Sequence, residues 1–199
     1  MFKKALQDTV RPYIIYQTNN TFPRPLLLDS QDVIGFSGKP VMLSRYNPNG
    51  EVVYKGKTVK YSNSNDFYYE QNACIRQFSY ASSDTNKEKP LFVVASGTGN
   101  LKLVLFSEDS VIAETTFSSN SSFHIDIKSY KIDICVLYDY TLLVSYVSEK
   151  DNQRTVHVRK ITYDENNKKF VMDNFDISRS TDNYYISCVQ TENFIIVCQ

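Results

Sequence analysis

Residues 39–43 read Lys-Pro-Val-Met-Leu, and an apolar run of this kind returns three more times along the chain. The counterparts are Lys89-Pro90-Leu91-Phe92-Val93, Tyr140-Thr141-Leu142-Leu143-Val144 and Glu192-Asn193-Phe194-Ile195-Ile196. The second residues of the four segments stand at positions 40, 90, 141 and 193, so the spacings are 50, 51 and 52 residues. A nearly constant period of this length is typical of repeat architectures, in which each repeat is one small unit of strands or helices.

A second apolar segment precedes each of these runs. In three units it begins seven residues before the second residue of the run, at Val33, Ile134 and Ile186. In the second unit its counterpart, residues 75–80, stands farther back, because the polar stretch at residues 82–89 lengthens the loop between the two segments.

Two further strand-like runs follow each of the first three aligned segments. The first set comprises Glu51–Tyr54, Leu101–Phe106 and Thr155–Arg159, and the second comprises Thr58–Tyr61, Val111–Phe117 and Phe170–Met172. Apolar and polar residues alternate in Thr155–Arg159, as expected for a strand with one buried face. Turn-forming residues separate the runs at 47–50, 97–100 and 164–167. Each unit is therefore predicted to contain four strands.

These patterns predict an all-β fold, specifically a β-propeller-like array of four-stranded antiparallel blades with a period of about 50 residues. We expect a single repeat domain, with the following segments: N-terminal strands in residues 1–30, blade 1 in 31–70, blade 2 in 71–119, blade 3 in 120–180 and a partial blade 4 in 181–199. A short helix around residues 3–10 is a weaker expectation.

The fourth unit ends after its second strand, which leaves three arrangements open. In the first arrangement, the spare strands Tyr13–Tyr16 and Pro25–Leu28 complete the last blade and close a small ring. In the second, the chain is part of a larger propeller. The second arrangement is favoured, because four-bladed rings are uncommon. A plain β-sandwich is the third arrangement and fits the regular period least well.

In blade length and strand layout, residues 32–199 resemble β-propeller repeat proteins. The Gly-His and Trp-Asp pairs of WD40 repeats and the double glycine of kelch repeats do not occur. Phe22-Pro23-Arg24-Pro25 resembles the arginine-bearing entry motif of sialidases, but the Asp boxes of those enzymes need tryptophan, and the chain has none. The resemblance therefore implies an architecture and no activity, and Arg24 is read as a solvated loop residue.

Composition narrows the classes of partner and compartment. The 22 basic and 22 acidic residues give no net charge, so nucleic-acid binding is not expected. No apolar run approaches the roughly 20 residues of a membrane span. The first eight residues lack the apolar region of a signal peptide, which favours the cytoplasm for the chain as written. An extracellular location follows if the chain is a fragment, and only then would the glycosylation triplets at Asn19 and Asn120 matter.

Four widely spaced cysteines, Cys74, Cys135, Cys188 and Cys198, include no Cys-x-x-Cys pair. Structural zinc sites draw their ligands from such close pairs, so neither a metal nor another cofactor is expected. Buried free thiols in apolar strands are the favoured reading, and disulfides are the alternative, so the redox state of the four residues stays open.

Residues able to carry acid–base chemistry are few. On a strand, His124 and Asp126 would share a face, which suggests a surface pair more than a metal site or proton relay, and His157 reads as exposed on an outer strand. The glycines of residues 97–100 fit a hairpin turn better than a phosphate loop, because a strand and no helix follows. Four carboxylates near predicted strand ends could gather around a central channel or cap loops: Asp32, Asp133, Asp139 and Asp176.

With no catalytic, cofactor or metal residue assigned, the leading expectation is a non-catalytic protein-interaction scaffold. Tyrosines near predicted loops would suit protein or carbohydrate recognition, although packing between blades is the favoured explanation for them: Tyr68, Tyr69, Tyr138, Tyr140, Tyr184 and Tyr185. The first alternative is a carbohydrate-active, hydrolase-like propeller. The second is an ectodomain fragment of a membrane protein.

Overall fold

The protein consists of antiparallel sheets connected in chain order. The computed structural model describes residues 26–28, 30–38, 40–61, 65–68, 73–78, 90–97, 99–118, 132–137, 140–150, 152–181, 187–190 and 195–198. The described residues form strands, turns and bends and contain no helix. This confirms the predicted all-β fold, whereas the helix expected near residues 3–10 lies outside the described residues.

Three sheets have four strands each. The first sheet contains β1 (Leu26–Leu27), β2 (Val33–Gly38), β3 (Val41–Tyr46) and β4 (Val52–Thr58). The second contains β7 (Cys74–Phe78), β8 (Leu91–Ser96), β9 (Leu101–Ser107) and β10 (Val111–Phe117). The third contains β11 (Ile132–Val136), β12 (Thr141–Lys150), β13 (Gln153–Asp164) and β14 (Lys169–Thr181). In each of them neighbours in the chain pair as neighbours in the sheet.

Two smaller sheets have two strands each. The fourth sheet pairs β15 (Ser187–Gln190) with β16 (Ile195–Cys198), and a short hairpin pairs β5 (Lys60–Tyr61) with β6 (Asn65–Asp66). The aligned segments of the sequence lie in β3, β8 and β12, which begin 50 residues apart at Val41, Leu91 and Thr141. The fourth aligned segment, residues 192–196, reaches into β16, which begins at Ile195, and its first three residues lie outside the described residues.

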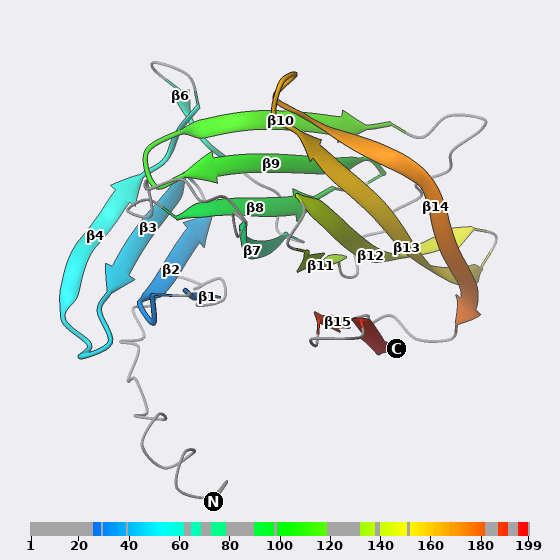
Figure 1. Ribbon diagram of the computed structural model, residues 1–199, viewed down its shortest axis with the longest axis horizontal. Helices are drawn as coiled ribbons and strands as arrows, with labels where there is room; N and C mark the ends of the chain where they lie inside the picture. The colour runs from blue at the N-terminus through cyan, green and yellow to red at the C-terminus, as the bar shows by residue number, and fades with distance from the viewer. Residues whose placement is uncertain are drawn as a thin grey trace, which may run out of the picture.

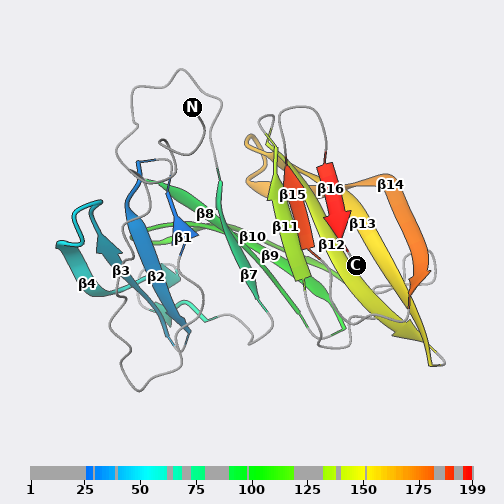
Figure 2. The same ribbon diagram turned by 90° about the horizontal axis from the view of Figure 1, so that it is seen from below.

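The three large sheets lie side by side along an arc (Figure 1). The edge strands β4, β10 and β14 are on the outer side of this arc, and β1, β7 and β11 are on the inner side. Seen from below, β7 lies between β1 and β11, and β15 lies beside β11 (Figure 2). These inner strands contact one another in the same order, from β1 through β7 and β11 to β15.

The second sheet buries both of its faces, because successive side chains of a strand point in opposite directions. Phe92 and Val94 of β8 pack toward the first sheet, whereas Val93 and Ala95 pack toward the third. The two resulting apolar clusters hold most of the core. One contains Ile34, Phe36, Val41, Leu43, Val59, Phe67, Phe92, Val94, Val104 and Phe106, and the other contains Phe78, Val93, Ala95, Leu101, Leu103, Leu105, Ile134, Leu142, Val144, Tyr146, Ile161, Tyr163 and Phe170.

Residues 58–61 do not form the fourth strand that we predicted for the first unit. β4 ends at Thr58, and the chain then crosses the end of β3, where the Val59 N–H donates to the Val41 carbonyl at 2.9 Å. Val59 and Phe67 are both fully buried in the cluster between the first and second sheets. Burying two such side chains stabilises the fold by about 1.5–3 kcal/mol each. This gain exceeds the stabilisation expected from one more short exposed strand.

The fourth place in the first sheet is taken by β1 on the opposite side. Leu26 pairs with Ile34 and Leu27 with Val33, so this segment does not extend the last sheet. The turn at Leu28–Asp32 explains the local pairing: the Leu28 N–H donates to the Asp32 carbonyl at 2.9 Å, and Gln31 adopts a positive φ of 68°. Closing a short loop costs less conformational entropy than closing the whole chain. The other spare strand, residues 13–16, lies outside the described residues.

Candidate functional site

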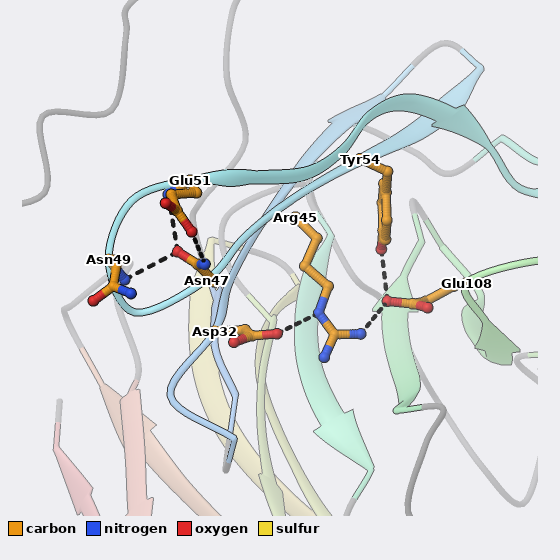
Figure 3. A network of polar contacts seen from close by, with 7 residues as sticks. All are labelled: Asp32, Arg45, Asn47, Asn49, Glu51, Tyr54 and Glu108. Atoms are coloured by element: carbon orange, nitrogen blue, oxygen red, sulfur yellow. Dashed lines mark hydrogen bonds and ion pairs between the residues drawn. The ribbon is translucent and has the colours of Figure 1, made fainter.

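Arg45 of β3 binds two carboxylates at the junction of the first and second sheets (Figure 3). Its Nε lies 2.6 Å from Asp32 Oδ2, and its Nη1 lies 3.0 Å from Glu108 Oε1. The Tyr54 hydroxyl donates to the same Glu108 oxygen at 2.7 Å. The side chains of Arg45, Asp32 and Glu108 are only 17%, 13% and 9% exposed. These four residues, the Arg45 network, therefore tie the two sheets together.

Two members of the Arg45 network, Tyr54 and Arg45, have a raised pKa. Burial and the bond to Glu108 raise the pKa of Tyr54, so its phenol stays protonated. Burial alone would lower the pKa of Arg45, but the bonds and charges of Asp32 and Glu108 outweigh it and raise that pKa. Two carboxylates and an arginine are the set expected of a hydrolytic pocket. Here, however, Tyr54 lies on the edge strand β4 and Glu108 lies in the turn to the edge strand β10, away from the inner strands.

The turn between β3 and β4 lies next to the Arg45 network and matches the turn predicted from the sequence. Asn47 Oδ1 accepts the N–H groups of Asn49 and Glu51 at 3.0 and 2.9 Å, and Gly50 has a φ of 82° (Figure 3). Gly97, Gly99 and Asn100 likewise lie between β8 and β9, which pair as a hairpin through Ser96 and Lys102. This pairing fits the hairpin turn predicted from the sequence.

A second polar cluster joins the inner strands β7 and β11. Asp133 Oδ1 accepts the Cys74 thiol at 3.1 Å and the N–H of Ile134 at 3.0 Å, and it also binds Arg76 Nη2. Arg76 Nε donates to the Ile134 carbonyl at 3.1 Å. Asp133 thus lies in β11, on the inner side of the arc (Figure 1). Its charge is balanced by Arg76, and the pair links the second and third sheets.

Cys74 and Cys135 are buried free thiols, as predicted, whereas the side chains of Cys188 and Cys198 lie outside the described part of the structure. Burial raises the pKa of Cys74 to about 12, and the nearby Asp133 carboxylate adds to this, while Arg76 opposes it. The thiolate is the reactive form of cysteine. We therefore expect Cys74 to react with iodoacetamide at pH 7.5 at least tenfold more slowly in the folded protein than in urea, measured by peptide mass spectrometry. Equal rates in both states would contradict its burial.

His157 of β13 belongs to a third polar cluster and is not exposed, contrary to our prediction from the sequence. Its side chain is 12% exposed and stacks on Tyr146, with the ring centroids 5.0 Å apart. Ser148 Oγ lies 2.9 Å from His157 Nε2, and Asp176 Oδ1 lies 3.5 Å from Nδ1. Arg159 Nη2 binds the other Asp176 oxygen at 2.8 Å. The neighbouring strands β12 and β14 cover the imidazole, which alternation along β13 alone did not reveal.

The order Ser148, His157, Asp176 follows the pattern of a nucleophile, a base and a residue that orients the base. The local structure does not complete such a site. Ser148 is buried at 9% exposure and lies within β12, whereas a catalytic serine needs access and nearby free N–H donors for the oxyanion. Asp176 is also held by Arg159. The cluster is best described as a set of polar bonds across three strands.

The buried imidazole makes stability depend on pH. Burial lowers the pKa of His157 below 6.5, although Asp176 opposes this shift. The unfolded chain therefore binds a proton more readily than the folded protein, so stability is complete above pH 6.5 and falls as the pH decreases through the folded pKa. We expect the free energy of unfolding to decrease between pH 7 and pH 5 by up to about 1.4 kcal/mol per pH unit.

The variant His157→Gln isolates this contribution, because it removes the buried imidazole and leaves the other titratable groups in place. The difference in unfolding free energy between wild type and variant, from urea denaturation at pH 7 and pH 5, is expected to shrink at the lower pH. A difference that is constant with pH would contradict the account.

Comparison with known proteins adds no family. No protein family model, no curated protein and no solved structure matches this chain. Within the described ranges, no three His, Cys, Asp or Glu side chains are grouped to hold a metal ion. Nor does that part of the chain contain a helix with the length and apolar content to cross a bilayer.

Of the tyrosines named as candidates from the sequence, two lie in the described residues. Tyr140 packs against the cluster between the second and third sheets, 6.1 Å from Phe78 between ring centroids, whereas Tyr68 is 54% exposed. The remaining candidates lie outside the described residues: Asn19, Arg24, Tyr69, Asn120, His124, Asp126, Tyr138, Asp139, Tyr184 and Tyr185.

Exposed apolar side chains gather on two edge strands. Val52 and Val53 of β4 are 57% and 54% exposed, and Val171, Phe175 and Ile177 of β14 are 45%, 43% and 56% exposed. Edge strands also present unpaired backbone groups, so apolar side chains on them favour pairing with another chain. This surface on β14 was not predicted, because residues 173–181 are mostly polar and were not expected to form a strand.

Proposed function

We propose that the chain is a non-catalytic protein-interaction scaffold of the β-propeller type. The contacts between the inner strands of successive sheets and the two apolar clusters between sheets support this arrangement. In a propeller, blades pack face to face around an axis and their edge strands lie at the rim. β4, β10 and β14 have this outer position (Figure 1).

The observation that carries the proposal is the contrast between charged and apolar side chains. Arg45, Arg76 and Arg159 each pair with carboxylates between strands or sheets. The edge strands β4 and β14 instead expose the apolar side chains of Val52, Val53, Phe175 and Ile177, next to exposed charged residues such as Lys55 and Arg179. An enzyme keeps charged groups available for substrate, whereas a binding surface presents apolar anchors surrounded by polar residues.

The rival function is a carbohydrate-active, hydrolase-like propeller, for which the sequence suggested carboxylates as the active groups. In the structure, the contact of Ser148 with His157 also resembles part of a hydrolytic site. To separate the two functions, the purified chain is assayed with 4-methylumbelliferyl acetate and 4-methylumbelliferyl glycosides. We expect no turnover above that of the variant His157→Gln. Turnover that the variant loses would contradict a non-catalytic scaffold.

Binding is tested with two double variants, Val52→Asp/Val53→Asp on β4 and Phe175→Asp/Ile177→Asp on β14. Proteins captured by the immobilised chain are identified, purified and titrated against each variant. We expect one double variant to weaken binding of a purified partner at least tenfold, which corresponds to about 1.4 kcal/mol. Ile112→Asp on β10, where Ile112 is 36% exposed, is the control and should bind as wild type. Equal binding by all variants would contradict these surfaces.

A further inference from the structure

The second half of β14 is exposed on both of its faces. Residues 173–180 are all exposed, and β14 pairs with β13 alone among the described strands. A bulge lies at the start of this half: Ile161 pairs with Met172 and Arg159 with Asp176, so residues 173–175 of β14 lie opposite Lys160. Bulges increase the local twist of a strand. β14 accordingly curves along the outer side of the third sheet (Figure 1).

The sequence of this half is complementary to itself in one antiparallel register. With a two-fold axis at Ile177, Ile177 opposes Ile177 of the second copy, and Phe175 opposes Arg179 of the second copy. The first pair is apolar, and the second places a guanidinium beside an aromatic ring. Within the chain, no ion pair joins the Arg179 side chain to a described residue. The register centred on Asp176 would instead bring two Asp176 carboxylates face to face, which is unfavourable.

We propose that two copies of the chain associate through antiparallel pairing of their β14 strands about a two-fold axis at Ile177. The inference rests on the proposed function, since it names a second copy as the protein that β14 binds. Antiparallel edge pairing satisfies backbone groups of both strands, and a two-fold axis uses the same surface on both copies. One strand pair makes a small interface, so the dimer is weak, with a dissociation constant on the order of micromolar or higher.

Sedimentation velocity over a concentration series tests the association. We expect a monomer–dimer equilibrium for the wild type and a dissociation constant at least tenfold higher for Ile177→Asp, because this variant opposes two carboxylates at the axis. Ile112→Asp should leave the equilibrium unchanged. A wild type that stays monomeric up to millimolar concentration, or an equal effect of both variants, would overturn the proposal.

Disulfide cross-linking tests the register. Directly opposed residues have Cα atoms about 4.5–5.5 Å apart, which suits a disulfide. We expect Ile177→Cys to give a covalent dimer on oxidation, beyond the background of the wild-type cysteines. Phe175→Cys should not, because its counterpart lies four residues away along the strand, about 13 Å. Equal cross-linking by both variants, or none by Ile177→Cys, would overturn the register.

The experiments distinguish failure of the proposed dimer from failure of the proposed interaction scaffold. If the chain is monomeric, the dimer is wrong, and the capture experiment with the β14 double variant still tests the scaffold. If β14 dimerises but no other protein binds, the partner is the second copy alone.

Discussion

Replacing Phe106 with alanine is expected to lower the free energy of unfolding by about 3–5 kcal/mol, the range for removing a large aromatic side chain from a core. Phe106 is fully buried in the cluster between the first and second sheets. Its ring centroid lies 5.4 Å from those of Phe67 and Phe92 and 6.2 Å from that of Phe36. The substitution would therefore leave a cavity between the two sheets, at the point where Phe36, Phe67 and Phe92 now meet the Phe106 ring.

Urea denaturation followed by circular dichroism measures this loss. Phe106→Leu, which retains most of the volume, should cost less than half as much. Phe175→Ala removes the same side chain from a position that is 43% exposed and should change stability by no more than about 0.5 kcal/mol. A loss below 1 kcal/mol for Phe106→Ala would show that the first and second sheets do not pack through this ring.

Replacing Arg45 with methionine should cost about 3 kcal/mol, because it leaves the carboxylates of Asp32 and Glu108 largely buried without their counter-charge. Breaking a buried ion pair by removing one partner typically costs 3–5 kcal/mol. We expect the lower end of that range, since the three side chains keep some contact with solvent.

The double variant Arg45→Met/Glu108→Gln should recover part of this loss, because it removes one of the two uncompensated carboxylates. Lys60→Met is the control: the Lys60–Asp66 pair is also 2.6 Å long, but its side chains are 53% and 32% exposed. Exposed pairs contribute at most about 1 kcal/mol. If Arg45→Met costs no more than Lys60→Met in the same urea titration, the Arg45 network does not hold the sheets together.

Much of the strand order was predictable, because the information is local. The alternation in Thr155–Arg159 and the turn at residues 97–100 specify strands and hairpins without reference to the rest of the chain. The central strand β8 was evident from its continuous apolar sequence, which suits a strand buried on both faces.

The errors arose where distant packing overrides local pattern. Residues 58–61 resemble a strand, but burial of Val59 between two sheets takes the chain across the end of β3. β14 continues to Thr181 through Asp, Asn and Ser, which disfavour strands on their own. Pairing with β13 supplies the backbone hydrogen bonds that residue preferences do not.

The polar clusters were beyond prediction for a related reason. Arg45 and Glu108 are 63 residues apart, and Arg76 and Asp133 are 57 apart. Asp32, Asp133 and Asp176 were named as candidates, yet the sequence did not show that each would bind an arginine from another strand or sheet. His157 appeared exposed, because the sequence does not show that Tyr146 lies opposite it.

A crystal structure of the chain tests the central claim, the stacking of sheets around an axis, most directly. The account predicts that the inner strands β1, β7, β11 and β15 lie next to one another in that order, with Arg76 bound to Asp133 and Phe36 against Phe92. A two-layer sandwich in which the first and third sheets face each other directly, without the second between them, would contradict it.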